Sequence, residues 1–392
     1  MYKLQTLNKI SQVGLGIALQ AGYEAASEIL NPDAILVRSA TMHEMEIPAS
    51  VKAIARAGAG VNNIPVDKCA DMGIIVFNTP GANANGVKEL ALAGMLLASR
   101  NIVRGVIWGK TLVGKGDEVP KLIEKGKADF VGPELKGKRL GVIGLGAIGV
   151  MVANDAVSLG MRVSGFDPYI SVEAAWGLSR EVRRARSLEN LLAESDYISL
   201  HLPLNDKTKG MINRERLAIM KKGVYLLNLS RGGLVRNEDL FAAIADGTVA
   251  AYVTDFPDEE LLKNDKVIAI PHLGASTPEA EDNCAIMAVN QVRDFLEHGN
   301  IKNSVNFPDC DLGPAQKNRV IIANRNIPNM VGQITTLLAS EHINIADMIN
   351  RNKGDFAYNI IDIDGDFPAA LIDKIRAING VVMVRHITPP VA

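Results

Sequence analysis

The segment from Arg139 to Asp167 constrains the fold of this chain more than any other. An apolar run, RLGVIG (139–144), is followed by a helical pattern, AIGVMVANDAVSLG (147–160), and by a second apolar run, RVSGFD (162–167). This order predicts a βαβ unit, in which two parallel strands are joined by a helix that covers one face of their sheet. Because apolar runs alternate with helical patterns on both sides of this unit, we expect an α/β protein with parallel sheets.

Three glycines open the helix of this unit at the spacing GxGxxG, namely Gly144, Gly146 and Gly149. In a dinucleotide-binding loop the first glycine permits a tight turn, the second lets the backbone approach a pyrophosphate, and the third lets the helix pack close to the strand. The pyrophosphate then lies at the helix N-terminus, where free N–H groups favour an anion. A glycine-rich turn is the simpler explanation of the spacing alone, but its place between a strand and a helix predicts a dinucleotide site.

The second strand of the unit ends at Asp167, 23 residues after Gly144. A carboxylate at this position accepts hydrogen bonds from the ribose hydroxyls of the adenosine and repels a 2′-phosphate. The predicted cofactor is therefore NAD rather than NADP. A strand-end turn residue before Pro168 is the alternative role of Asp167.

Two side chains that follow predicted strands are candidates for chemistry on a 2-hydroxy acid. Arg231 follows the buried run GVYLLNLS (223–230), and a guanidinium matches a carboxylate in a bidentate pair. His272 ends the run VIAIPH (267–272), and an imidazole there can accept a hydroxyl proton as hydride leaves the same carbon. Open α/β sheets bind ligands at the edge where their strands end. A surface ion pair for Arg231 and a structural role for His272 are the alternatives.

Composition excludes several classes of partner. The net charge is −2 and no block of Lys or Arg stands out, which argues against nucleic acid and anionic membrane surfaces. The three cysteines (Cys69, Cys284 and Cys310) lie far apart, which argues against a disulfide framework or a zinc site and predicts a cytoplasmic protein. No apolar run reaches 18 residues and the N-terminus resembles no signal peptide, so we expect no membrane span.

The chain resembles the D-isomer-specific 2-hydroxyacid dehydrogenase family over about residues 30–310. Besides the glycine loop, the matching segments are RAGAGVNN (56–63), NTPGANANGVKEL (78–90), HLPL (201–204), NLSRGGLV (228–235), TDFPDEELL (254–262) and PHLGAST (271–277). The resemblance implies a flavodoxin-like substrate domain (residues 1–93 and 283–310) with an inserted Rossmann NAD domain (94–282). It also implies that the active site lies in the cleft between these two domains and that the protein is a homodimer or homotetramer.

By the same resemblance, Arg231, a glutamate and His272 form the catalytic triad. The family usually reads Asp-Val-Phe-x-x-Glu-Pro where this chain has Asp255-Phe-Pro-Asp-Glu-Glu. If the family's aspartate is aligned with Asp255, its glutamate falls on Glu260, which we favour. If the family's phenylalanine is aligned with the Phe-Pro pair instead, its glutamate falls on Glu259. The residues implied at the NAD site are Gly144, Gly146, Ala147, Ile148, Gly149, Asp167, Pro203, Thr208, Leu229, Asp255 and His272.

Within that family the closest resemblance is to the branch that oxidises D-3-phosphoglycerate, the first step of serine synthesis. VRSAT (37–41) matches the segment that grips the substrate there and implicates Arg38 and Ser39, while Asn83 matches the asparagine of the following substrate loop. Lys110 resembles a lysine that reaches the substrate phosphate of a neighbouring subunit. Solvated surface charge is the alternative role of Lys110. Another 2-hydroxyacid dehydrogenase, such as a glyoxylate or hydroxypyruvate reductase, is the alternative activity.

After a linker-like stretch (300–318), residues 318–392 predict the order βαββαβ, a ferredoxin-like motif. This segment resembles an ACT domain, the small-ligand regulatory unit of amino-acid metabolism. By resemblance Asn326 and Asn344 would bind an L-serine effector across a dimer of these domains. A helix cap or turn is the alternative role of Asn326.

Overall fold

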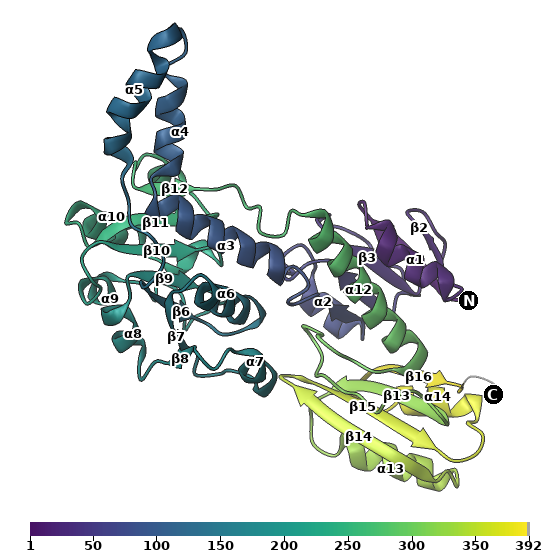
Figure 1. Cartoon of the computed structure of the whole chain (residues 1–392). Helices are drawn as coiled ribbons and strands as arrows, with labels where there is room; N and C mark the ends of the chain where they lie inside the picture. The colour runs from purple at the N-terminus through teal and green to yellow at the C-terminus, as the bar shows by residue number, and fades with distance from the viewer. Residues whose placement is uncertain (390–392) are drawn as a thin grey trace. The chain divides into compact units, whose positions relative to one another are not determined.

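The computed structural model describes residues 1–389 and divides into two compact units (Figure 1). The first unit comprises Met1–Asn83 and Pro278–Ala392, and the second comprises Ala84–Thr277. The predicted domain limits at residues 94 and 282 fall inside helices α3 (Ala84–Ser99) and α12 (Pro278–His298). Each of these helices is continuous and lies entirely within one unit. The boundaries between the two units therefore fall where the helices begin, at Ala84 and Pro278.

A five-stranded parallel sheet forms the centre of the first unit, in the order β2-β1-β3-β4-β5. Its strands are β1 (Lys3–Leu7), β2 (Glu24–Ala26), β3 (Ala34–Val37), β4 (Ala53–Arg56) and β5 (Ile75–Phe77), with helices α1 (Gln12–Gln20) and α2 (Val66–Asp71) between them. Helix α12 packs on α1 and against β3, β4 and β5. The two helices approach so closely that a Cβ on Gly14 would lie 2.6 Å from the Cβ of Ala285. Chain segments from both sides of the second unit therefore share this core.

The C-terminal part of the first unit is a four-stranded antiparallel sheet in the order β14-β15-β13-β16. Its elements follow one another as β13 (Asn318–Arg325), α13 (Met330–Ser340), β14 (Ile345–Lys353), β15 (Phe356–Ile363), α14 (Ala369–Arg376) and β16 (Val381–Ile387). The predicted βαββαβ order is therefore confirmed. Helices α13 and α14 share an apolar core with one face of the sheet, whereas Tyr358 and Ile360 on the other face join the core that contains α12.

Two arginines of this antiparallel sheet bind the end of helix α12. Arg319 is fully buried, forms a bidentate pair with Asp362 (2.6 and 2.9 Å), and donates a hydrogen bond to the carbonyl oxygen of His298 (2.8 Å). Arg385 donates to the carbonyl oxygen of Leu296 (2.8 Å). The last carbonyls of a helix have no partner within the helix, and its dipole favours a positive charge there. The antiparallel sheet is thus held on α12 by charge-assisted hydrogen bonds as well as by apolar contact.

The second unit contains a seven-stranded parallel sheet in the order β12-β11-β10-β9-β6-β7-β8. The strands are β6 (Arg139–Ile143), β7 (Arg162–Phe166), β8 (Arg183–Arg184), β9 (Tyr197–Leu200), β10 (Val224–Asn228), β11 (Val249–Thr254) and β12 (Val267–Ala269). Helices α3 and α6 (Ala147–Ser158) share the core on one face. The other face is covered by α8 (Leu188–Glu194), α9 (Arg214–Ala218) and α10 (Asn237–Ala245). The chain reverses its direction of growth between β6 and β9, and such switch points are where open α/β sheets bind ligands.

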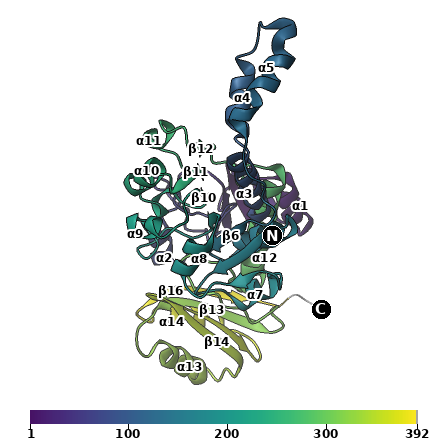
Figure 2. The same cartoon turned by 60° about the vertical axis from the view of Figure 1, so that its left-hand side comes forward.

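A helical hairpin of the second unit extends away from this sheet (Figure 2). It contains α4 (Ile102–Lys110) and α5 (Val119–Gly126), neither of which has a buried residue. Val106 and Ile107 on α4 are 54% and 62% exposed, so the hairpin presents apolar side chains to solvent. Among the described residues no single helix has the length and apolar composition to cross a membrane, and only the bent pair of α3 and α4 passes that test jointly.

Candidate active site

The strands of the second unit end level with one another at one edge of the sheet. Cα pairing joins Phe166, Ile143, Leu200, Asn228, Thr254 and Ala269 in a single row across the sheet. The residues that directly follow the strands include Gly144, Asp167, Leu229 and Asp255, all of which are predicted cofactor residues. The parallel register therefore brings residues more than a hundred positions apart to a common edge.

Each glycine of the GxGxxG loop meets a different steric demand. Gly144 has a φ of +90°, and a Cβ there would lie 2.3 Å from the carbonyl oxygen of His201. A Cβ on Gly149 would lie 1.9 Å from the carbonyl oxygen of Gly144. At Gly146, the residue before α6, no atom lies within 4 Å of an added Cβ. The space above the helix N-terminus is thus open, which fits the pyrophosphate of a dinucleotide.

Asp167 is held beside this loop by two backbone amides. Its carboxylate accepts hydrogen bonds from the N–H groups of Leu145 (2.8 Å) and Tyr169 (2.8 Å), and the residue is half-buried. A carboxylate oxygen can accept more than one hydrogen bond, so capacity remains for ribose hydroxyls. Ala147 and Ile148 form the first turn of α6, directly after Gly146.

Two turns at the same edge of the sheet contain further predicted cofactor residues. The hydroxyl of Thr208 donates to the carbonyl oxygen of Pro203 (2.6 Å) and closes the turn after β9. Leu229 is buried directly after β10. All the predicted cofactor residues therefore lie on the second unit, at or near the carboxyl ends of β6, β7, β9, β10, β11 and β12.

Two side-chain hydrogen bonds hold the turn that contains Arg231. The side-chain amide of Asn228 donates to the carbonyl oxygen of Arg231 (2.9 Å), and the hydroxyl of Ser230 donates to that of Leu200 (2.5 Å). The Arg231 side chain is exposed, and its Nη1 donates to the neighbouring carbonyl oxygen of Ser230 (2.6 Å). Because its other N–H donors face no acceptor among the described residues, the guanidinium is available for an anionic ligand.

Phe256 connects the two predicted catalytic side chains. Its ring lies edge-on to the imidazole of His272, with centroids 4.5 Å apart, and the Cζ of Arg231 lies 6.0 Å from the same ring. Since one aromatic ring contacts both side chains, the structure brings Arg231 and His272 together. Phe256 carried no signal in the sequence beyond its place directly after Asp255.

A buried carboxylate lies near the same pair of side chains. Asp255 is only 4% exposed, and its Oδ1 has no hydrogen-bond partner among residues 1–389. Burial raises the pKa of the Asp255 carboxyl, while the nearby charges of His272 and Arg231 act in the opposite direction. An orphaned buried acceptor at a strand end fits a ligand that brings its own donor, such as a carboxamide.

Neither predicted glutamate is brought to His272. The side chain of Asp258 accepts a hydrogen bond from the N–H of Leu261 and begins helix α11 (Glu259–Leu262). Both glutamates lie in the first turn of α11, where they pair with Lys263 at 3.2 and 2.9 Å and are 85% and 69% exposed. No ion pair of either with His272 occurs in the described part of the chain. The choice between Glu259 and Glu260 therefore stays a prediction.

The predicted substrate residues Arg38, Ser39 and Asn83 belong to the first unit. Arg38 directly follows β3 and pairs with Glu281 of α12 (2.7 Å). The backbone N–H of Ser39 donates to the side-chain oxygen of Asn8 (3.2 Å), which fixes the turn after β3. Asn83 is the last residue of this unit before α3. Lys110 is the last residue of α4 and is exposed on the helical hairpin of the second unit.

The predicted effector residues Asn326 and Asn344 lie on the antiparallel sheet part of the first unit. The amide of Asn326 donates to the carbonyl oxygen of Gly354 (3.2 Å), and that of Asn344 donates to Asp364 (2.7 Å). The residue that precedes α13 is Asn329, so Asn326 does not cap that helix. Both amides are exposed and keep donors or acceptors free for a ligand.

We expect the imidazole of His201, whose Nδ1 is buried without a hydrogen-bond partner among residues 1–389, to weaken the fold in acid. Burial lowers its pKa from 6.5 to about 4, so between these pH values the unfolded chain binds more protons than the folded one. The free energy of unfolding should therefore fall as pH falls through this window, by about 3 kcal/mol at its lower end. Urea unfolding at several pH values measures this dependence. His201→Asn should flatten it, whereas His43→Asn at an exposed position should not. Equal slopes in both variants would contradict the assignment.

Comparisons with known proteins agree on one family. Residues 93–274 match the profile described as D-isomer specific 2-hydroxyacid dehydrogenase, NAD binding domain. The chain is 33% identical to a D-3-phosphoglycerate dehydrogenase of Methanocaldococcus jannaschii over 88% of its own length and 64% of that protein. It is 40% identical to a hydroxypyruvate reductase of Thermotoga maritima, over 68% of its own length and 85% of that protein.

A solved structure is similar in fold to the larger part of the chain. The NAD⁺-bound 3-phosphoglycerate dehydrogenase of Entamoeba histolytica is 28% identical, has a TM-score of 0.59, and covers 78% of this chain and 98% of its own. The chain spans about three fifths of the length of the curated phosphoglycerate dehydrogenases that it matches, namely 64% of the M. jannaschii protein and 59% of that of Bacillus subtilis.

Proposed function

Because this chain belongs to the D-isomer-specific 2-hydroxyacid dehydrogenase family, we propose that it oxidises D-3-phosphoglycerate to 3-phosphohydroxypyruvate with NAD. This is the first step of L-serine synthesis. The observation that carries the proposal is the similarity to phosphoglycerate dehydrogenases over 88% of the chain. Reduction of hydroxypyruvate or glyoxylate is the second candidate, favoured by the 40% identity to a hydroxypyruvate reductase, but that similarity accounts for only 68% of the chain.

NAD is the proposed cofactor, bound at the carboxyl edge of the seven-stranded sheet. The open space at Gly146 and the carboxylate of Asp167 beside it support this placement. When bound, NAD accepts the hydride at its nicotinamide ring. The buried Oδ1 of Asp255, which has no protein donor among the described residues, would accept a hydrogen bond from the carboxamide of that ring.

In the proposed reaction Arg231 and His272 act on the substrate. The guanidinium fork of Arg231 binds the substrate carboxylate and the oxygen on C2. A ring nitrogen of His272 accepts the hydroxyl proton while the hydride leaves C2, so the C2–O bond becomes a carbonyl. The shared contact of both side chains with Phe256 supports their acting on one substrate, since it sets the distance between them.

We expect the two glutamates of α11 to differ in their effect on turnover. If Glu260 orients His272 when substrate is bound, Glu260→Gln should lower kcat by about 10- to 100-fold, and Glu259→Gln by less than about twofold. Steady-state NADH formation measures both, with Glu238→Gln on α10 as a control for removing an exposed carboxylate. Small and equal losses would remove both glutamates from the mechanism and leave Asp255 as the carboxylate near His272.

We propose that the substrate phosphate is bound by Arg38 and by Lys110 of a neighbouring subunit, with Ser39 and Asn83 as further substrate contacts. A ligand can reach both cations. The ion pair of Arg38 with Glu281 is partly open to solvent, since the two side chains are 34% and 41% exposed, and Lys110 is exposed. A phosphate dianion would have to replace Glu281 on Arg38. Charge-assisted hydrogen bonds to phosphate are strong enough to make that exchange favourable.

We further propose that the antiparallel sheet and its two helices form an ACT domain that binds L-serine. The βαββαβ order and the exposed amides of Asn326 and Asn344 support this assignment. The proposed assembly is a homodimer or homotetramer, since an effector bound across two such domains needs a second copy. A cytoplasmic location is proposed on the basis of the three unpaired cysteines, all of them buried.

The experiment that tests the function is NADH formation from D-3-phosphoglycerate at alkaline pH, with and without L-serine. Turnover that falls with serine supports both the catalytic and the regulatory assignment. Turnover that serine leaves unchanged removes the effector role of Asn326 and Asn344 and keeps the catalytic one. Absence of turnover, with reduction of hydroxypyruvate or glyoxylate by NADH, would move the assignment to the second candidate.

A further inference from the structure

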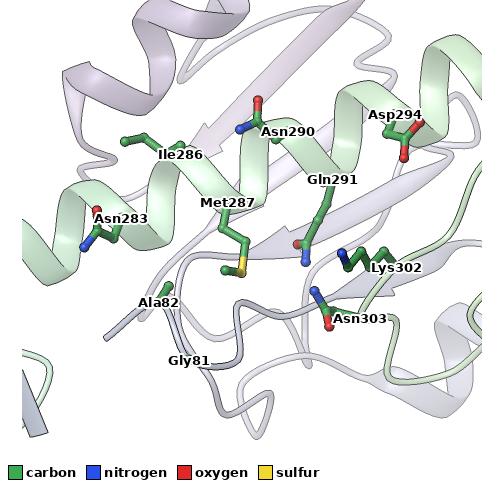
Figure 3. Close-up of a pocket in the computed structure, with 10 residues that line it drawn as sticks. All are labelled: Gly81, Ala82, Asn283, Ile286, Met287, Asn290, Gln291, Asp294, Lys302 and Asn303. Carbon is green, nitrogen blue, oxygen red and sulfur yellow. The ribbon is translucent and has the colours of Figure 1, made fainter. Parts of the chain in front are cut away.

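The first unit contains a cavity of about 530 Å³ that none of the assigned catalytic, cofactor, substrate or effector residues line (Figure 3). Helix α12 forms one wall, and the segments Gly81–Ala82 and Lys302–Asn303 form the other. We call it the α12 cavity. The α12 residues that line it are Asn283, Ile286, Met287, Asn290, Gln291 and Asp294. Their spacing of three and four residues places them on one face of the helix.

The chemistry of this wall is mixed and nearly balanced in charge. Four side-chain amides line it, together with one cation, Lys302, and one anion, Asp294. Ile286 and Met287 are the apolar side chains of α12 that line it. Amides offer both donors and acceptors, so the wall suits a ligand that carries both signs of charge and a short apolar part.

Gln291 gives the second and independent indication of a ligand. The residue is only 8% exposed, and neither Nε2 nor Oε1 has a hydrogen-bond partner within residues 1–389. Figure 3 shows its amide directed from α12 toward the Lys302–Asn303 segment. Most buried polar side-chain atoms have a partner, because leaving one unpaired is costly. An amide that lacks both a donor and an acceptor partner fits a ligand that supplies both.

The two charged side chains that line the cavity, Lys302 and Asp294, can each form further hydrogen bonds or ion pairs. Lys302 is exposed and makes no ion pair or hydrogen bond with any described residue. One oxygen of Asp294 accepts from the side chain of Asn300 (2.9 Å), and the other has no protein partner among the described residues. An ammonium and a carboxylate on one small molecule would match these two groups.

We propose that the α12 cavity binds a small zwitterion of the α-amino-acid class. The ligand carboxylate pairs with Lys302, its ammonium group pairs with Asp294, and the amide of Gln291 bonds to both ends. A short uncharged ligand side chain lies on Ile286 and Met287. This site differs from the proposed serine site, which is formed by Asn326 and Asn344 on the antiparallel sheet.

The test is a thermal-shift screen of the full chain against each proteinogenic amino acid, followed by calorimetric titration of those that raise the Tm. At least one amino acid should raise the Tm by a few degrees, because it binds the folded state alone. The matching carboxylate without an ammonium group, and the matching amine without a carboxylate, should not. A screen in which no amino acid raises the Tm would overturn the proposal.

Variants separate this site from the proposed serine site. Gln291→Leu should abolish the shift without lowering the Tm of the free protein, since it removes two unpartnered polar atoms and keeps the side-chain bulk. Lys302→Met, at an exposed position with no folding risk, should weaken binding at least about tenfold. Gln12→Leu on α1 is the matched control and should keep the shift. Binding that persists in Gln291→Leu and Lys302→Met but is lost in Asn326→Ala/Asn344→Ala would overturn the proposal and assign the ligand to the serine site.

Discussion

Replacement of His272 by asparagine is expected to lower kcat for D-3-phosphoglycerate oxidation by about 10²- to 10⁴-fold, the usual contribution of a general base. Asparagine keeps a polar side chain of similar size but cannot accept the hydroxyl proton at neutral pH. The loss should fall on kcat, because in the proposed mechanism Arg231, and not His272, holds the substrate carboxylate. NADH affinity should change far less than kcat, since the other predicted cofactor residues lie at the ends of different strands.

Steady-state NADH formation and a fluorescence titration of NADH measure these two quantities on the same preparation. His43→Asn in the first unit is the matched control, because His43 is exposed and lies outside the proposed catalytic set. A near-normal kcat in His272→Asn would show that another group accepts the proton. A parallel loss of NADH affinity would instead assign His272 to cofactor binding.

Replacement of Arg319 by methionine is expected to lower the free energy of unfolding by about 3–5 kcal/mol. Arg319 is fully buried, and without it the mostly buried carboxylate of Asp362 loses both of its charge-assisted hydrogen bonds. The carbonyl oxygen of His298 also loses its donor at the end of α12. Arg319→Lys should lose less, because it keeps the charge but not the bidentate fork.

Urea unfolding followed by circular dichroism measures this loss. Arg376→Met is the matched control, because Arg376 forms an exposed pair with Asp373 that is worth only about 0–1 kcal/mol. Equal losses in Arg319→Met and Arg376→Met would mean that the buried pair does not fasten the antiparallel sheet to α12. If Arg319→Met lowers the stability of only one of two unfolding transitions, the antiparallel sheet unfolds separately from the rest of the unit.

The parts of the fold that depend on local pattern could be predicted from the sequence. The glycine spacing after β6 predicts the turn at Gly144 and the close helix approach at Gly149, because each demand is local. The βαββαβ order of the C-terminal segment likewise follows from alternating apolar periodicity. The edge where the predicted cofactor residues meet follows from parallel pairing, which aligns strand ends regardless of their distance in sequence.

Features that depend on tertiary contacts left little trace in the sequence. Helix α5 lies in a glycine- and lysine-rich stretch, whose composition does not specify a helix. The orientation of Glu260 depends on the cap formed by Asp258 and on the pairing with Lys263, neither of which motif spacing reveals. Gln291 reads as an ordinary polar residue of an amphipathic helix, and only its burial without partners distinguishes it.

The contacts between the antiparallel sheet and α12 limit how the C-terminal segment that contains this sheet can be gained or lost in evolution. Cutting the chain before β13 would leave the last carbonyls of α12 without Arg319 and Arg385 and would uncover Phe295 and Phe307, both now fully buried. Exposed aromatic side chains promote aggregation. A shortened descendant would therefore need polar replacements along α12 in the same step, and a grafted module would need a recipient helix that already ends in an apolar face.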